Sequence, residues 1–279
     1  MVLSGKTRLA GVVGWPVSHS LSPRLHGHWL ERYGIDGAYV PLPVAPEDVA
    51  RVLPLLPRMG FAGVNVTVPH KEAALAAVDE VTETARRIGA VNTIVARSDG
   101  SLLGDNTDGY GFRQNLAHWH PDGRPAVVVG AGGAARAVCV ALLDAGVVAI
   151  RLLNRTGARA EALAADMGGG AFTVLDWNHP DDALEGAGLL VNTTALGMAG
   201  QPPLDLPLDG LPGDALVTDI VYTPLETPLL AAARARGNPA VDGLGMLLHQ
   251  ARPGFAAWFG RDPDVDEALR QFVLAGLAP

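Results

Sequence analysis

One short segment constrains the fold more than any other: a run of small residues stands between an apolar stretch and a long helical pattern. The apolar stretch is Ala126–Val129. The run that follows it, of the form G-x-G-x-x-A, is Gly130, Ala131, Gly132, Gly133, Ala134 and Ala135. Small residues let the backbone approach a ligand closely, and the free N–H groups at a helix start bind pyrophosphate. In this strand–turn–helix order, the motif favours a dinucleotide-binding unit over a tight structural turn.

The end of the next apolar stretch, Ile150–Leu153, predicts which dinucleotide binds. A unit that binds NAD carries Asp or Glu about 20 residues after the glycines, where it accepts from the ribose 2′-hydroxyl. Here Asn154, Arg155 and Thr156 follow the stretch, and Arg159 comes shortly after. Two guanidinium groups without a carboxylate suit the 2′-phosphate of NADP. The alternative is a solvated arginine beside a Thr156 that caps a helix.

Short apolar runs alternate with segments of helical period along the chain. The expected strands are Leu9–Gly14, Ala38–Pro43, Gly63–Val66, Thr93–Arg97, Ala126–Val129, Ile150–Leu153, Phe172–Leu175, Leu189–Asn192 and Ala215–Asp219. The expected helices are Pro23–Tyr33, Pro46–Met59, Pro69–Val78, Ala134–Ala145 and Thr156–Met167. This alternation predicts an α/β fold with parallel sheets and helices on both faces.

Two breaks in the alternation indicate about two domains in the 279 residues. Residues 98–101 (SDGS) predict a hairpin turn and an antiparallel sheet edge. A second strand–helix series begins after the loop Pro121–Pro125. The last part of the chain has only helical patterns, at Leu244–Phe259 and Val265–Leu277, which is typical of a tail that packs back onto an earlier domain.

Composition excludes several classes of protein. The net charge is −8 and no block of Lys or Arg occurs, so we expect no nucleic-acid partner. No apolar run is long enough to span a bilayer, and the N-terminus lacks the pattern of a secretory signal. The single cysteine, Cys139, cannot form an intramolecular disulfide and is expected to be a small buried apolar residue. The histidines show no metal-ligand spacing, so the sequence predicts a cytoplasmic protein without a metal site.

Outside the glycine turn, polar residues gather after several of the expected strands. They occur in residues 19–23 (HSLSP), 65–71 (NVTVPHK), 90–93 (AVNT) and 104–109 (GDNTDG), and at Gln250. Ligands of open α/β sheets bind beyond the carboxyl ends of the strands, so these loops could converge. Hydroxyls, amides, one lysine and one aspartate suit a small polyhydroxylated ligand.

Each of these polar residues also has a structural alternative. Ser22 before Pro23 has the pattern of a helix cap, and Asp108 could cap the following helix. Asn65 and Thr67 could satisfy backbone groups in a turn. Lys71 could be a solvated helix residue, although the first turn of a helix disfavours a cation. We favour a functional interpretation because the residues occur together, beside a dinucleotide unit.

These motifs together resemble the shikimate dehydrogenase family along nearly the whole chain. The matching segments are 14–23 (GWPVSHSLSP), 65–71 (NVTVPHK), 89–93 (GAVNT), 104–109 (GDNTDG), 130–136 (GAGGAAR), 154–156 (NRT), 192–198 (NTTALGM), 219–224 (DIVYTP) and 242–250 (DGLGMLLHQ). The resemblance implies NADPH-dependent, reversible reduction of 3-dehydroshikimate to shikimate in aromatic amino-acid biosynthesis. It also implies a discontinuous substrate domain of residues 1–106 and 241–279, and a Rossmann domain of residues 107–240. The enzyme is expected to be a monomer or a homodimer.

The resemblance also implies roles for individual residues. The catalytic pair would be Lys71 and Asp108, with Lys71 stabilising the alkoxide and supplying its proton, and Asp108 orienting it. The substrate-binding residues would be Ser20, Ser22, Thr67, Asn92, Asp108, Tyr222 and Gln250. The cofactor-binding residues would be Gly130, Ala131, Gly132, Gly133, Ala134, Asn154, Arg155, Thr156, Arg159, Ile220, Gly243 and Glu83.

Two rival functions stay open. One is a quinate dehydrogenase or a dual quinate/shikimate enzyme, against which the Ser20-x-Ser22 pair resembles the shikimate-specific form. The other is a non-catalytic metabolite sensor with the same fold. The presence of Lys71, Asp108 and a complete glycine turn argues against the sensor.

Overall fold

The computed structural model describes residues 3–276, and its contacts divide the chain into two compact units. Unit 1 comprises Met1–Gly111 and Leu248–Pro279, and unit 2 comprises Phe112–Leu247. The boundaries fall inside α5 (Asp108–Asn115) and α10 (Leu244–Phe259). The boundaries expected from the sequence, after residues 106 and 240, lie a few residues earlier along the chain.

Unit 1 contains a mixed sheet, which within residues 3–276 has six strands in the order β2-β1-β3-β5-β6-β4. The strands are β1 (Arg8–Gly14), β2 (Gly37–Pro43), β3 (Phe61–Val66), β4 (Glu80–Val81), β5 (Thr93–Ala96) and β6 (Leu102–Asp105). β1 pairs in parallel with β2 and β3, whereas β5 is antiparallel to β3 and β6. The predicted hairpin and its antiparallel pairing are therefore confirmed. The hairpin is not the sheet edge, however, because β4 pairs with the outer side of β6.

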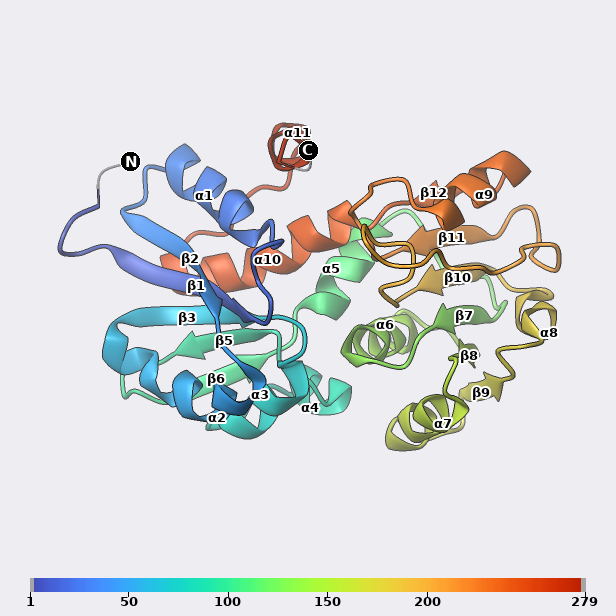
Figure 1. Cartoon of the computed structure of the whole chain (residues 1–279), viewed down its shortest axis with the longest axis horizontal. Coiled ribbons are helices and arrows are strands. Elements are labelled where there is room, and N and C mark those ends of the chain that lie inside the picture. The colour runs from blue at the N-terminus through green and yellow to red at the C-terminus, as the bar shows by residue number, and fades with distance from the viewer. Residues whose placement is uncertain (1–2, 277–279) are drawn as a thin grey trace. The chain divides into compact units, whose positions relative to one another are not determined.

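The helices of unit 1 lie on both faces of this sheet, with α1 and α10 on one face and α2, α3 and α4 on the other (Figure 1). Their bounds are α1 (Ser22–Arg32), α2 (Val49–Val52), α3 (Lys71–Ala77), α4 (Glu83–Ile88) and α11 (Glu267–Leu274). A single helix over Pro46–Met59 is wrong. Pro54 and Pro57 have no N–H to donate, and the segment breaks into short 3₁₀ turns at Pro46–Asp48, Leu53–Leu55 and Pro57–Met59 around α2. The predicted end of the last helix, Leu277, lies outside the described residues.

An aromatic cluster packs under α1 and holds a buried histidine. Trp29, Phe255 and Trp258 are almost fully buried, and the His26 ring stacks on Tyr39 with 3.9 Å between ring centroids. Both nitrogens of His26 are buried without a hydrogen-bond partner among the described residues. Burial lowers the pKa of His26 from 6.5 to about 3, and the nearby Asn65 side chain opposes this shift only in part.

This histidine should make unit 1 sensitive to acid. Between about pH 6.5 and pH 3 the unfolded chain binds a proton at His26 that the folded chain does not bind. Stability therefore falls as the pH falls through this window, by about 1.4 kcal/mol per pH unit from this group. We expect His26→Phe to remove this contribution, so that urea midpoints decline less steeply from roughly pH 6 to pH 4 than in the parent. The exposed His19, changed to Phe, is the control, and identical slopes for parent and His26→Phe would contradict the expectation.

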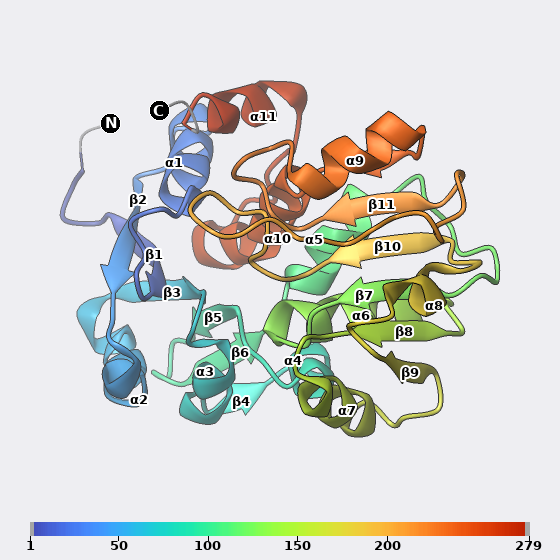
Figure 2. The same ribbon diagram turned by 45° about the vertical axis from the view of Figure 1, so that its right-hand side comes forward.

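Unit 2 contains a parallel sheet in the order β12-β11-β10-β7-β8-β9, and Figure 2 shows its neighbouring strands from β11 to β9. Its strands are β7 (Ala126–Val129), β8 (Ile150–Leu153), β9 (Phe172–Leu175), β10 (Leu189–Asn192), β11 (Leu216–Asp219) and β12 (Ala240–Val241). Every pairing in it is parallel, as predicted. Counted from β7, the order is that of the doubly wound dinucleotide-binding fold. The order of the strands reverses between β7 and β10. A fold of this kind binds its ligand beyond the carboxyl ends of the two strands at that point.

Helices cover both faces of this sheet because its strands are apolar on both sides. The helices are α6 (Gly133–Asp144), α7 (Gly157–Asp166), α8 (Pro180–Leu184) and α9 (Pro228–Arg236). Ala126 and Val128 pack with residues of α6 and α7, and Val127 and Val129 pack with residues of α8 and α9.

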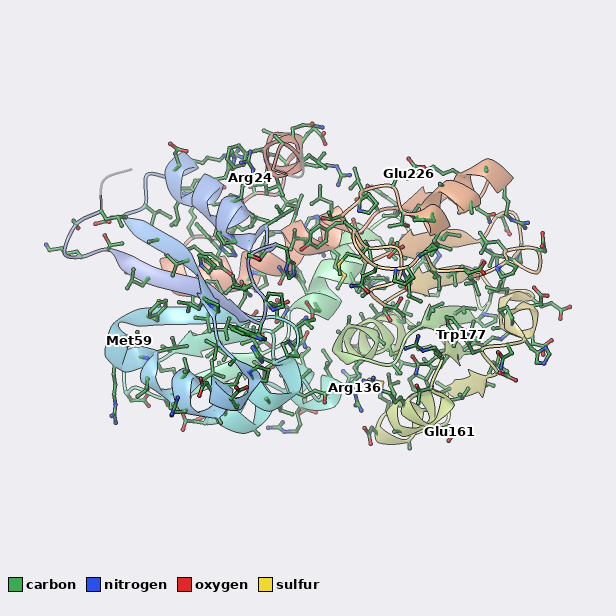
Figure 3. All side chains as sticks on the ribbon, in the orientation of Figure 1. Arg24, Met59, Arg136, Glu161, Trp177 and Glu226 are labelled. Atoms are coloured by element: carbon green, nitrogen blue, oxygen red, sulfur yellow. The ribbon has the colours of Figure 1, made fainter. Side chains whose placement is uncertain are left out.

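Two polar side chains of α6 are buried or paired within unit 2. Cys139 is fully buried, and burial raises the pKa of its thiol to about 12, which leaves it unreactive at neutral pH. Arg136, labelled in Figure 3, forms an ion pair of 2.5 Å with Asp166 of α7.

Candidate active site

The two predicted catalytic residues form an ion pair in unit 1. Lys71 is the first residue of α3, and Asp108 is the first residue of α5, directly after the loop that follows β6. Lys71 Nζ lies 2.6 Å from Asp108 Oδ2, and the two side chains are only 19% and 8% exposed. The alternative of a solvated lysine is therefore wrong. The first turn of a helix is unfavourable for a cation, and the Asp108 carboxylate supplies the compensating negative charge.

The Asn92 carboxamide holds the second oxygen of this carboxylate. The Asn92 side chain donates from Nδ2 to Asp108 Oδ1 at 2.8 Å, and the same nitrogen lies 3.4 Å from Gln250 Oε1. The backbone N–H of Asp108 donates to Asn106 Oδ1 at 3.0 Å. Lys71, Asn92, Asp108 and Gln250 are thus brought together, as the sequence predicted for a polar ligand site.

The predicted hydroxyl groups lie in loops after β1 and β3, which are parallel neighbours. The capping alternative for Ser22 is wrong, because α1 begins at Ser22 itself and has no side-chain cap. The Ser22 side chain is buried against the Tyr39 hydroxyl, and Ser20 Oγ accepts the Ser22 N–H at 3.3 Å. Thr67 is half-buried just after β3, where its N–H donates to the Val13 carbonyl. Ser20, Ser22 and Thr67 therefore all follow the carboxyl ends of two neighbouring parallel strands.

Four further polar residues of this cluster belong to the polar segments that the sequence singled out, although no individual role in the site was predicted for them. Asn65, Thr93, Asn106 and Thr107 are all buried and hydrogen-bonded to one another or to Asn92 and Ala90. Asn65 lies inside β3 and binds Tyr39 and Thr93, but it also meets its structural alternative, because its Nδ2 donates to the Asn92 carbonyl in the bend before β5. The sequence offered one indication of this role, since Asn65 stands between two valines in an otherwise apolar strand.

The glycine turn of unit 2 has two kinds of glycine. Gly130 has φ of 116°, and a Cβ there would lie 2.5 Å from Thr193 Oγ1, so the fold itself requires glycine. Gly132 has φ of −99°, and a Cβ there would meet no described atom within 4 Å. No residue in the described part of the chain requires glycine at this position, whereas a closely approaching pyrophosphate would. No side chain caps α6, so its first N–H groups are available to such a ligand.

The residues expected at the 2′-phosphate lie after β8 in the same unit. Arg155 and Arg159 are exposed, and within residues 3–276 neither forms an ion pair. Asn154 Nδ2 donates to the Thr156 carbonyl at 2.8 Å. Thr156 occupies the cap position of α7 without a side-chain cap hydrogen bond, so the capping alternative is not realised. These groups fit a phosphate monoester.

The remaining predicted site residues fall in both units. A Cβ on Gly243 would lie 2.4 Å from the Ile220 carbonyl, so these two cofactor candidates are adjacent in unit 2. Tyr222 follows in the same loop, and burial raises the pKa of its hydroxyl. Glu83 belongs to unit 1, where it is exposed at the start of α4 and pairs with Arg86. No hydrogen bond or ion pair of the described residues joins Glu83 to Lys71, Asn92, Asp108 or Gln250.

The described part of the chain contains neither a cluster of metal-ligating side chains nor a membrane-spanning helix. Residues 3–276 hold no group of three or more His, Cys, Asp or Glu arranged to bind a metal ion. None of their helices is both long enough and apolar enough to cross a membrane.

Three family models match consecutive parts of the chain. Residues 12–94 match the shikimate dehydrogenase substrate binding domain. Residues 115–197 match the shikimate / quinate 5-dehydrogenase model, and residues 243–271 match the shikimate 5′-dehydrogenase C-terminal domain.

Known proteins are similar over nearly the whole length. The shikimate dehydrogenase (NADP(+)) of Rhodospirillum rubrum is 65% identical, over 98% of this chain and 99% of its own. The crystal structure of shikimate 5-dehydrogenase from Thermus thermophilus with NADP(H) and shikimate has a TM-score of 0.86 at 39% identity, over 96% of this chain and 99% of that one. Quinate dehydrogenase from Corynebacterium glutamicum in complex with NAD has a TM-score of 0.88 at 34% identity, over 96% of this chain and 99% of that one.

Proposed function

The chain belongs to the shikimate dehydrogenase family, and from that premise we propose that Lys71 and Asp108 catalyse its reaction, the NADP-dependent, reversible reduction of 3-dehydroshikimate to shikimate. This reaction serves aromatic amino-acid biosynthesis. The observation that carries the residue assignment is the 2.6 Å ion pair between two largely buried side chains. Taking two charges out of water costs desolvation energy that their attraction need not repay, so fold stability alone is a weak reason for such a pair.

The roles of the pair follow from the charge that develops during the reaction. NADPH, when bound, supplies the hydride. Negative charge then develops on the ketone oxygen of the substrate, and the Lys71 ammonium group stabilises it and donates the proton. Asp108 holds the ammonium group in place through Oδ2, while Asn92 fixes the carboxylate through Oδ1. In the reverse direction the Lys71 amine accepts the proton of the shikimate hydroxyl.

The neighbouring polar groups suit the rest of the substrate. We assign the hydroxyl and carboxylate contacts to Ser20, Ser22, Thr67, Asn92 and Gln250, with Asp108 and Tyr222 assisting. Hydroxyls and carboxamides both donate and accept, which matches a ring with several hydroxyls. Unit 1 would then be the substrate domain and unit 2 the cofactor domain, with the glycine turn, residues 154–156, Arg159, Ile220 and Gly243 on NADP. Glu83 is the weakest member of the cofactor set, since it is exposed and paired with Arg86.

A single assay tests the reaction and its rivals. The purified protein is mixed with shikimate or quinate and with NADP⁺ or NAD⁺, and the absorbance of the reduced nicotinamide is followed. We expect the highest kcat/KM with shikimate and NADP⁺. A higher value with quinate would favour the quinate or dual enzyme, an alternative that the similarity to quinate dehydrogenase supports. No reduction in any combination would favour the sensor and contradict the proposal.

We also propose a cytoplasmic location and a monomeric or homodimeric state. The only cysteine is buried and cannot form an intramolecular disulfide, which suits a reducing compartment.

A further inference from the structure

We propose that Thr93 is a positioning residue, which fixes the Asn92 carboxamide so that it holds the Asp108 carboxylate. It acts within a chain of hydrogen bonds that runs through Tyr39, Asn65, Thr93 and Asn92 to Asp108. All five residues are buried and belong to unit 1. The inference rests on the proposed function, because it concerns the surroundings of Asp108 in that reaction.

A backbone carbonyl fixes the orientation of Asn65 at the start of the chain. One terminal atom of this side chain lies 3.2 Å from the Asn92 carbonyl oxygen, which can only accept, so this atom is the amide nitrogen. Asn65 Oδ1 therefore faces Tyr39, whose hydroxyl donates to it at 2.7 Å. Burial raises the pKa of Tyr39 well above its ordinary value, so its hydroxyl keeps the proton it donates.

A backbone N–H fixes the orientation of Asn92 at the other end. The Thr107 N–H can only donate, and it lies 2.8 Å from one terminal atom of Asn92, which must be the oxygen. Asn92 Nδ2 is thereby turned to Asp108 Oδ1, at 2.8 Å. With the other rotation of this carboxamide, an oxygen would face the carboxylate and repel it.

Thr93 connects these two fixed amides. Its hydroxyl accepts from Asn65 Nδ2 at 3.2 Å and donates to Asn92 Oδ1 at 2.9 Å. The Thr107 hydroxyl is also within 3.2 Å of Asn92 Oδ1, but it lies closer, at 2.8 Å, to the Gln250 carbonyl, which can only accept. The Thr93 hydroxyl has two possible acceptors, Thr107 Oγ1 at 3.2 Å and Asn92 Oδ1 at 2.9 Å, and Asn92 is the nearer. We therefore assign the Thr93 proton to Asn92. Every donor in the chain points towards Asp108, an arrangement in which each hydrogen bond polarises the next.

Removal of the Thr93 hydroxyl should loosen this hold without changing the shape of the core. Asn92 Oδ1 would keep the Thr107 N–H but lose its second donor, and Asn65 Nδ2 would lose an acceptor. The Asn92 carboxamide then has more freedom to rotate, so that Asp108 and, through it, Lys71 are held less firmly. The effect should be seen in catalysis with shikimate and not in the binding of NADP⁺.

A double-mutant cycle tests this role. We expect Thr93→Val to lower kcat/KM for shikimate by about 10-fold, which is the scale of one buried hydrogen bond. Thr93→Ser, which keeps the hydroxyl, should stay within about 3-fold of the parent. Because Thr93 acts through Asn92, Thr93→Val should cost little more in an Asn92→Ala background. The KM for NADP⁺ should be unchanged in all of these proteins.

The possible results separate the inference from a structural role and from the proposed function. If the two losses multiply in the double variant, or if Thr93→Ser is as impaired as Thr93→Val, the positioning role is overturned. If Thr93→Val does not fold, Tyr39→Phe decides, since it removes the first donor of the chain. We expect it to lower kcat/KM for shikimate about 3-fold, whereas the matched control Tyr33→Phe, whose hydroxyl bonds to the surface residue Asp264, should not. An unaffected Tyr39→Phe would then overturn the inference. An inactive parent would contradict the proposed function itself, whereas an active parent with unaffected variants would contradict this inference alone.

Discussion

A Lys71→Met variant is expected to lose about 10²–10⁴-fold in kcat, because it removes both a positioned proton donor and the cation that stabilises the alkoxide. Methionine keeps most of the side-chain volume, so the packing at the start of α3 should be preserved. The decisive measurement is the pre-steady-state rate of hydride transfer at one pH. The exposed Lys6, changed to Met, is the matched control and should transfer hydride at the parent rate. A Lys71→Met variant that does the same would exclude Lys71 as the acid and base.

The partner variant, Asp108→Asn, should also lower kcat, since it leaves the ammonium group without its carboxylate at 2.6 Å. If the two residues act as one unit, the double variant should lose far less than the product of the two single losses. Binding of NADPH should survive in all three variants, because the glycine turn lies in unit 2. Strictly multiplicative losses would show that Lys71 and Asp108 act independently.

The sheet of unit 2 was the most predictable part of the fold. The strands Ala126–Val129, Ile150–Leu153, Phe172–Leu175 and Leu189–Asn192 were predicted to the residue. Most of them are short apolar runs, and Gly130, Asn154 and Asp176 directly follow the first three, which is typical of buried parallel strands. The short strands Glu80–Val81 and Ala240–Val241 were missed because two residues carry no periodicity. Their pairing partners, β6 and β11, determine them instead.

The segment Pro46–Met59 shows why periodicity alone fails for helices. Val49, Val52, Leu53 and Leu56 recur at helical spacing and are largely buried. The apolar pattern therefore predicted the right buried face. It could not show that the prolines within the segment divide the backbone into short turns, because the same residues face the core in either conformation.

For the candidate site, the sequence predicted which residues gather but not how they are held. Lys71, Asn92, Asp108 and Gln250 were identified by residue type and by family resemblance, and the structure brings them together. The contacts of Thr107 with Asn92 and with the Gln250 carbonyl join residues far apart in the chain, so no local pattern predicts them. The helix-cap pattern at Ser22 was misleading for the same reason. The contact of Ser22 with Tyr39 depends on how α1 packs on β2.

The second large effect is expected at Arg155 and concerns the affinity for NADPH. Replacing Arg155 with Ala should weaken NADPH binding by about 10- to 150-fold, because a charge-assisted hydrogen bond to the 2′-phosphate is worth about 1.5–3 kcal/mol. The exposed Arg155 side chain forms no ion pair within residues 3–276, so its removal leaves no buried carboxylate unpaired. The dissociation constants of NADPH and NADH, measured by fluorescence titration, report the effect.

NADH makes this prediction specific, because it has a hydroxyl where NADPH has the 2′-phosphate. Its weak binding should hardly change in the Arg155→Ala variant, so the preference for NADPH over NADH should shrink by nearly the whole loss. A matched control is Arg234→Ala, which removes an exposed arginine of α9 that pairs with Glu226 and should leave both affinities unchanged. The affinity for NADPH should also lose part of its dependence on salt in the Arg155→Ala variant, since an exposed charge pair is screened by ions. Equal losses for NADPH and NADH would point to a packing role for Arg155 and contradict its assignment to the phosphate.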